Sequence, residues 1–159
     1  MKSLTDRVAA VTGAASGIGR ALAVNLAAKG CHLALSDVNE QGLRETARLI
    51  TNKNIKVTTH MVDVANREQV YRYADDVVEQ HGRVNIIINN AGVAVGDSIE
   101  EVSYEDFEWI VGINFWGVVY GTKAFLPHIK KEPEGHIVNI SSINGIVPGP
   151  FNGPYCATK

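Results

Sequence analysis

The sequence contains little cysteine and no clustered metal ligands. Its two cysteines, Cys31 and Cys156, cannot build a disulfide framework, and a cytosolic chain would keep both as thiols. The five histidines show no HxxxH spacing and no CxxC motif is present, so the sequence predicts no protein-ligated metal.

Charge of one sign and long apolar runs are also missing. The 15 basic and 17 acidic residues are scattered along the chain and give a formal net charge of −2. The segment from Met1 to Val8 is polar, and no apolar run approaches the roughly 18 residues that a membrane span needs. We therefore expect a cytoplasmic protein with no nucleic-acid partner and no membrane contact.

What the sequence does contain is the composition of one ordinary globular domain. Hydrophobic residues make up 45% and charged residues 20% of its 159 positions. No internal repeat, low-complexity tract or linker divides the chain. We therefore expect residues 1–159 to form a single domain.

Apolar segments alternate with helical segments along the whole chain. Strands are expected at residues 7–12, 31–37, 55–63, 84–90 and 136–141, and helices at 17–29, 39–52, 66–81 and about 104–131. Asn66 and Gly82 are suited to cap the third helix, and Ser103 to open the fourth. Because residues 84–89 and 137–140 are almost continuously apolar, we expect these strands to be covered on both faces. The pattern predicts an α/β fold, a doubly wound parallel sheet of the Rossmann type.

A glycine-rich segment, TGAASGIG at residues 12–19, lies where the first strand meets the first helix. Gly13 permits a tight turn, Gly17 opens the helix with exposed amide groups, and Gly19 allows the helix to pack close to the sheet. Such a loop lets a pyrophosphate approach the helix N-terminus. Glycines in this kind of loop can also serve backbone geometry alone, and that alternative stays open.

An acidic residue, Asp37, ends the second strand, 18 residues after Gly19. A carboxylate at this place can accept hydrogen bonds from the ribose hydroxyls of an adenosine, and its charge repels a 2′-phosphate. No arginine or lysine stands at Ser16 or Val38 to receive such a phosphate, so NAD is favoured over NADP. The structural alternative is a solvated loop carboxylate.

Tyr155 and Lys159 are four positions apart, which places both side chains on one face of a helix. A cation close to a phenol favours its ionised form, so the pair suits a tyrosine that acts as a general acid or base. A YxxxK pair also arises by chance in a chain of this composition, and the pair alone is weak evidence.

Ser142 lies 13 residues before Tyr155, just beyond the carboxyl end of the fifth strand, where open α/β sheets bind ligands. Its hydroxyl is suited to hold a substrate oxygen. Two structural alternatives stay open: Ser142 can bond to its own loop backbone, and Asn114 can be a polar kink within the long helix.

Together these motifs resemble the short-chain dehydrogenase/reductase family over residues 7–159. The order and spacing match for TGAASGIG, Asp63-Val64, Asn89-Asn90-Ala91-Gly92, Asn114, Ser142 and Tyr155-Cys156-Ala157-Thr158-Lys159. The resemblance implies that Tyr155 is the general acid/base and that Lys159 activates it and binds the nicotinamide ribose. Ser142 would orient the substrate oxygen, and Asn114 would hold a water in the proton relay. The other implied cofactor contacts are Gly13, Ser16, Gly17, Ile18, Gly19, Asp37, Asp63, Val64, Asn90, Ala91 and Gly92.

The resemblance implies hydride transfer between NAD(H), or less favourably NADP(H), and a small alcohol or ketone. The alternatives are a catalytically silent dinucleotide-binding module and a structural or interaction protein with the same fold. Family members continue beyond the motif that ends here at Lys159. We therefore expect a domain truncated after its fifth strand, without the family's further C-terminal strands and substrate loop, and inactive as a 159-residue chain. The oligomeric state stays open, with a homo-oligomer as one alternative for a full-length form.

Overall fold

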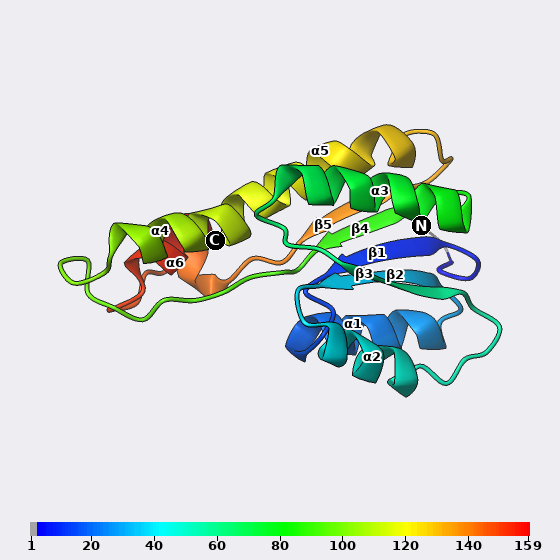
Figure 1. The fold of residues 1–159 in the computed structure, drawn as a ribbon, viewed down its shortest axis with the longest axis horizontal. Helices are drawn as coiled ribbons and strands as arrows, with labels where there is room; N and C mark the ends of the chain where they lie inside the picture. The colour runs from blue at the N-terminus through cyan, green and yellow to red at the C-terminus, as the bar shows by residue number, and fades with distance from the viewer. Residues whose placement is uncertain (1–2) are drawn as a thin grey trace.

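The computed structural model describes residues 3–159 and shows one parallel sheet flanked by helices (Figure 1). The strands are β1 (Val8–Thr12), β2 (His32–Asp37), β3 (Val57–Met61), β4 (Ile86–Asn89) and β5 (His136–Asn139). The helices are α1 (Gly17–Ala28), α2 (Glu40–Leu49), α3 (Arg67–His81), α4 (Tyr104–Val111), α5 (Gly117–Ile129) and α6 (Gly153–Thr158). A π-helix, η1 (Gly112–Trp116), joins α4 to α5, and a short 3₁₀ helix, η2 (Ile143–Gly145), follows β5. The predicted doubly wound parallel fold is confirmed.

The strand order, β3-β2-β1-β4-β5, determines where a ligand can enter the sheet. The chain moves outward from β1 through β2 to β3, and then returns to place β4 on the other side of β1. At such a reversal the loops leaving the two central strands diverge to opposite faces, and a crevice opens at the carboxyl edge of the sheet. The loops after β1 and β4 therefore frame the natural ligand site.

Helices cover both faces of the sheet centre. Figure 1 shows α1 and α2 on one face and α3 and α5 on the other. The residues of β1 alternate between the two layers: Val8 and Ala10 pack in the α3 and α5 layer, whereas Ala9 and Val11 pack in the α1 and α2 layer. Every residue of β1 and β4 is buried, which explains their apolar composition.

The expectation that β5 is covered on both faces is wrong. His136, Val138 and Asn139 are exposed, with 38% of Val138 accessible to solvent, whereas Ile137 packs against the α3 and α5 layer. The reason is position in the sheet: β5 is an outer strand that pairs only with β4 among residues 3–159. An apolar segment alone does not distinguish an outer strand from a central one.

Capping side chains define the helix ends as the sequence predicts. Asn66 accepts a hydrogen bond from the amide of Gln69 at 3.0 Å, and Ser103 accepts one from the amide of Asp106 at 3.0 Å. Gly82 ends α3 with a φ of 77°, the left-handed conformation that favours glycine.

The helical segment predicted at about 104–131 is divided by the π-helix. The amide of Gly117 donates to the carbonyl of Gly112, five residues earlier, and this wider turn contains Asn114. Single π-turns within α-helices occur frequently at functional sites. None of the helices described here combines the length and the apolar character needed to cross a membrane.

Two histidines share one hydroxyl group at the outer edge of the sheet. The Oγ1 atom of Thr58 on β3 lies 2.9 Å from Nε2 of His60 and 3.0 Å from Nε2 of His81. Burial, the positive charge of Lys56 and the neighbouring histidines hold the pKa of His81 at about 4, below its ordinary 6.5. Burial also lowers the pKa of His60.

We expect the folded chain to lose stability as the pH falls from about 6.5 to about 4. In the unfolded chain His81 binds a proton near pH 6.5, whereas the folded chain keeps its ring neutral, so protonation favours unfolding. In urea denaturation across this pH range, His81→Gln should flatten the fall in the free energy of unfolding, and His136→Gln, at an exposed position, should not. Equal slopes for wild type and His81→Gln would contradict this.

Candidate active site

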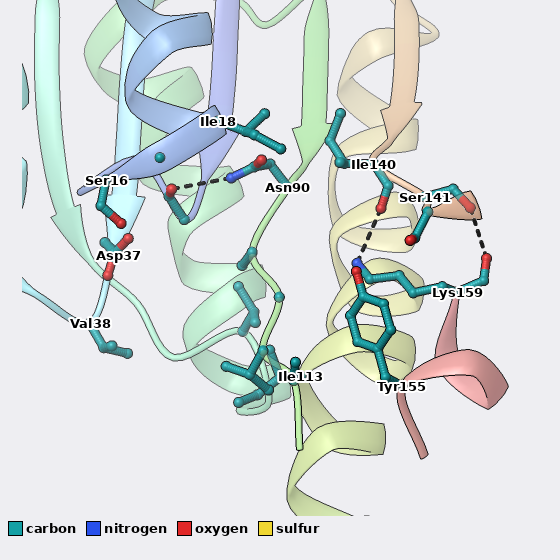
Figure 2. A pocket seen from close by; sticks show the side chains of 18 of the residues that line it. Ser16, Ile18, Asp37, Val38, Asn90, Ile113, Ile140, Ser141, Tyr155 and Lys159 are labelled. Atoms are coloured by element: carbon teal, nitrogen blue, oxygen red, sulfur yellow. Dashed lines mark hydrogen bonds between the residues drawn. The ribbon is translucent and has the colours of Figure 1, made fainter. Parts of the chain in front are cut away.

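One cavity of about 630 Å³ lies at the carboxyl edge of the sheet (Figure 2). It is lined by most of the residues that the sequence predicts for the site, namely Gly13, Ser16, Gly17, Ile18, Asp37, Asp63, Val64, Asn90, Ala91, Gly92, Ser142, Tyr155 and Lys159. Gly19 and Asn114 lie behind this wall and not on it. The fold therefore brings together segments from five βα connections.

Glycine at positions 13 and 19 allows the loop after β1 to lie directly against the loop after β4. A Cβ atom on Gly19 would lie 2.1 Å from the carbonyl oxygen of Gly13, and one on Gly13 would lie 2.8 Å from the Cα of Ala91. Gly13 also has a φ of 65°, which disfavours other residues. The loop can keep this position only if residues 13 and 19 carry no side chain.

Hydrogen bonds between the two loops maintain this close approach. The Asn90 side chain donates to the carbonyl oxygens of Thr12 at 2.8 Å and Gly13 at 3.1 Å. The hydroxyl oxygen of Thr12 accepts from the amides of Asn90 and Ala91, each at 3.0 Å. Asn90 and Ala91 thus join the loops as well as line the cavity.

The N-terminus of α1 opens toward the cavity. Ser16 is the N-cap residue, but its side chain makes no capping bond, and the first turn contains no acidic residue. The amide groups of this turn therefore keep the partial positive charge that attracts a phosphate group. This is the chemistry that the glycine loop predicts.

Asp37 is held by the backbone at the rim of the cavity. Its Oδ2 atom accepts from the amide of Ala15 at 3.0 Å and its Oδ1 atom from the amide of Asn39 at 3.0 Å. Two bonds leave lone pairs on a carboxylate for a further donor. The alternative of a freely solvated carboxylate does not describe this side chain.

Asp63 and Val64 form the neighbouring wall, after β3. Asp63 accepts from the amide of Ala65 at 2.9 Å, and its own amide donates to Gln69 at 2.8 Å. Val64 is buried and packs in the core next to the cavity. This wall is therefore fixed by bonds to the start of α3.

Tyr155, on α6, and Lys159, directly after α6, line the opposite end of the cavity. Figure 2 shows the tip of the Lys159 side chain at the hydroxyl end of Tyr155. The Nζ atom lies 5.7 Å from the ring centroid and donates to the carbonyl oxygen of Ile140 at 3.2 Å. The ammonium thus lies near the Tyr155 ring, and the catalytic role of the pair stays a prediction.

The buried side chain of Asn114 bridges two segments behind the site. Its Oδ1 atom accepts from the amide of Val93 at 2.8 Å, while its Nδ2 atom donates to the carbonyl of Val93 at 2.9 Å and to the hydroxyl of Thr158 at 3.1 Å. A Cβ atom on Gly92 would lie 3.3 Å from Asn114 and 3.1 Å from Lys159 Nζ, so Asn114 lies just behind the cavity wall. These contacts agree with the structural alternative, in which Asn114 is a polar residue where the helix is interrupted. The role of Asn114 in holding a water stays a prediction.

Ser142 makes the local contact that its structural alternative expects. Its hydroxyl oxygen accepts from the amide of Asn144 at 3.2 Å, which opens η2. The oxygen is the acceptor in that bond, so the hydroxyl proton remains for another acceptor in the cavity. Local bonding and a substrate contact are thus compatible.

Three residues near the catalytic motif were missed by the sequence reasoning. The Ser141 hydroxyl donates to the main-chain carbonyl of Lys159 at 2.8 Å, the Ile140 carbonyl receives the Lys159 ammonium, and Val93 pairs with Asn114. The place of Ser141 beside Ser142 was an available signal. The other two act through their main chains, which no residue pattern reveals.

Comparison with known proteins identifies the family. The profile of the family described as short chain dehydrogenase matches residues 7–159. The chain belongs to the short chain dehydrogenase family. The chain is similar to the curated proteins "Putative oxidoreductase SadH" of Mycobacterium tuberculosis, 48% identical over the whole chain, and short-chain dehydrogenase/reductase family 16C member 6 of Bos taurus, 41% identical over 99% of it. The chain spans 58% of the first relative's length and 50% of the second's.

Solved structures of this short chain dehydrogenase family share the fold. A short-chain dehydrogenase/reductase from Burkholderia phymatum in complex with NAD has a TM-score of 0.95 and 37% identity over 99% of this chain and 57% of its own. NAD⁺-bound xylitol dehydrogenase has a TM-score of 0.94 and 30% identity over 99% of this chain and 61% of its own.

We expect Gly19→Ala to destabilise the chain, because its methyl group would overlap the Gly13 carbonyl. Overpacking of this kind costs about 1–3 kcal/mol in the free energy of unfolding. Gly96→Ala is the matched control, since a Cβ atom there meets nothing within 4 Å. In urea denaturation, equal stability of the two variants would contradict the close approach.

Proposed function

We propose that this chain forms the cofactor-binding and catalytic part of an NAD-dependent oxidoreductase that acts on an alcohol or a ketone. One observation carries the proposal: a single cavity joins the glycine loop and Asp37 at one end to Tyr155 and Lys159 at the other. A dinucleotide has two chemically distinct ends, and this cavity offers a fitting set of groups to each. The domain organisation and the site roles are part of this proposal.

The residues at the first end fit a dinucleotide. Gly13 presents only backbone where the loop meets Ala91, and the open amides of α1 suit a pyrophosphate. Asp37 suits the ribose hydroxyls, while Asp63 and Val64 provide a wall for the adenine. The NAD complexes of two structural relatives support this assignment.

NAD is favoured over NADP by the charge at the same end. The carboxylate of Asp37 would face a 2′-phosphate with like charge, and neither Ser16 nor Val38 supplies a cation beside it. A 2′-phosphate at this rim would thus meet repulsion without a compensating contact.

At the second end, the chain supplies proton transfer and orientation. Bound NAD or NADH would supply the site for accepting or giving the hydride. As a phenolate, Tyr155 takes the proton from an alcohol, and as a phenol it returns a proton to a carbonyl oxygen. The Lys159 ammonium lies 5.7 Å from the centroid of the Tyr155 ring. Ser142 directs its remaining proton to the substrate oxygen, and Asn114 holds the Val93 segment and α6 in place.

The alternative is a dinucleotide-binding protein without catalysis. The observation in its favour is that the Ser142 hydroxyl is engaged with the backbone of its own loop. Cofactor binding without turnover distinguishes the two functions.

We expect Tyr155→Phe to lower turnover of secondary alcohols with NAD by about 10²- to 10⁴-fold, the usual contribution of a general acid or base. Turnover is measured on the complete gene product, and NADH binding should remain close to that of wild type. Tyr71→Phe, on the exposed side of α3, is the matched control and should keep full activity.

Unchanged turnover in Tyr155→Phe would contradict the assigned role. Wild-type protein that binds NADH but turns over neither secondary alcohols nor ketones would favour the binding protein. Wild-type protein that binds neither NADH nor NADPH would contradict both functions.

A further inference from the structure

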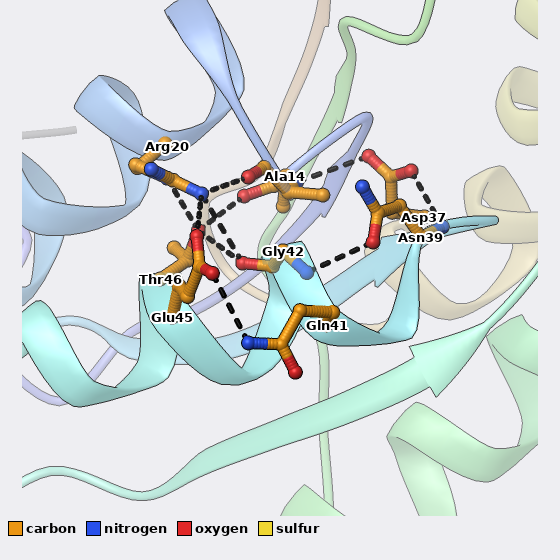
Figure 3. A network of polar contacts seen from close by, with 9 residues as sticks. Ala14, Arg20, Asp37, Asn39, Gln41, Gly42, Glu45 and Thr46 are labelled. Atoms are coloured by element: carbon orange, nitrogen blue, oxygen red, sulfur yellow. Dashed lines mark hydrogen bonds and ion pairs between the residues drawn. The ribbon is translucent and has the colours of Figure 1, made fainter.

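Two polar side chains, Arg20 and Thr46, bond to the backbone of the glycine loop (Figure 3). The Arg20 guanidinium, from the first turns of α1, donates to the carbonyl oxygen of Ala15. The Thr46 hydroxyl, from α2, lies 2.8 Å from the carbonyl oxygen of Ala14. Neither Arg20 nor Thr46 lines the cavity. Both consecutive carbonyls of the loop are thus held from behind.

Thr46 joins the two helices to the loop. Its side chain is fully buried, and its Oγ1 atom accepts from Nε of Arg20 at 3.0 Å. The single hydroxyl proton is then shared between the carbonyls of Ala14 and of Gly42, the latter 3.0 Å away. Removing this hydroxyl would leave buried groups on the loop and on Arg20 without their partner.

Arg20 is itself held by α2. Its Nη2 atom lies 3.2 Å from Oε2 of Glu45, whose other oxygen accepts from the Gln41 side chain at 3.1 Å. Glu45 is half-exposed, so this ion pair is a weak contribution next to the buried hydroxyl of Thr46. The planar guanidinium reaches the carbonyl, the hydroxyl and the carboxylate at once, which a lysine ammonium cannot do in this geometry.

Peptide geometry transmits this hold to the cavity side. In a trans peptide the C=O and N–H groups point in opposite directions. With the Ala14 carbonyl turned toward Thr46, the Ala15 amide points the other way, and it donates to Asp37 at 3.0 Å. With the Ala15 carbonyl turned toward Arg20, the Ser16 amide is directed to the opposite side, where Ser16 lines the cavity.

We propose that Arg20 and Thr46 are positioning residues that set the affinity for the dinucleotide by fixing the direction of the Ala15 and Ser16 amides. The inference rests on the proposed function, because it assigns these amides and Asp37 to cofactor binding. Without the two side chains, the Ala14–Ser16 peptides can rotate, the Asp37 carboxylate loses its fixed donor, and the loop must be ordered at the expense of binding energy.

The test compares NADH dissociation constants, measured by fluorescence, in variants of the 159-residue chain. Thr46→Val keeps the shape of the side chain and removes its hydroxyl. It should raise the NADH dissociation constant about tenfold, because losing one partner of a buried hydrogen bond usually has an effect of this size. Thr46→Ser keeps the hydroxyl and should restore affinity. Arg20→Lys keeps the charge but should bind like Thr46→Val.

Asn52→Ala is the matched control. Asn52 donates to the Ala27 carbonyl at 3.0 Å, so it ties α1 to the segment after α2 at the end far from the glycine loop. Asn52→Ala should lower the melting temperature without changing the NADH dissociation constant. Equal constants in wild type and Thr46→Val, or equal losses of affinity in Thr46→Val and Asn52→Ala, would overturn the inference.

A cofactor-free measurement separates this inference from the proposed function. Hydrogen exchange of the Ala15 amide should be faster in Thr46→Val than in wild type or Asn52→Ala. If the wild-type chain binds no NADH, the proposed function fails, and hydrogen exchange alone tests whether Thr46 positions the loop. Faster exchange of the Ala15 amide in Thr46→Val than in wild type supports the positioning role, and an unchanged rate overturns it.

Discussion

The site depends on the direct contact between the loop after β1 and the loop after β4. Asn90 bonds to the carbonyls of Thr12 and Gly13, and Gly19 leaves the space that this contact needs. The contact occurs at the reversal of strand order, where the two loops would otherwise diverge. The contact fixes Gly13, Asn90 and Ala91, which line the cavity between its two ends.

The two ends of the cavity are connected through the backbone after β4. Beyond Asn90 the chain passes Gly92, next to Lys159, and then Val93, which Asn114 holds through both of its amide atoms. Asn114 also bonds to Thr158, on the helix that carries Tyr155. A shift of the loop after β1 would therefore move the backbone next to which the Lys159 ammonium lies.

The sequence predicts well what depends on local spacing and poorly what depends on tertiary partners. The tight turn at Gly13, the capping role of Asn66 and the alternation of elements follow from steric and periodic rules, and the structure confirms them. The exposure of β5 depends on its neighbours in the sheet, so its apolar residues misled the prediction. The bonds from Asn114 to Val93 and from Thr46 to Ala14 join residues far apart in the chain, and no spacing encodes them.

The preference for NAD is tested most directly by the ratio of the NADPH and NADH dissociation constants, measured by titration of wild type and Asp37→Ala. We expect wild type to bind NADH at least about tenfold more tightly than NADPH, because the Asp37 carboxylate and the 2′-phosphate carry like charges. Asp37→Ala should narrow the ratio, whereas Glu79→Gln, at an exposed position on α3, should preserve it. Equal affinity of wild type for NADH and NADPH, or no affinity for either, would contradict the assignment of Asp37 and the glycine loop to NAD binding.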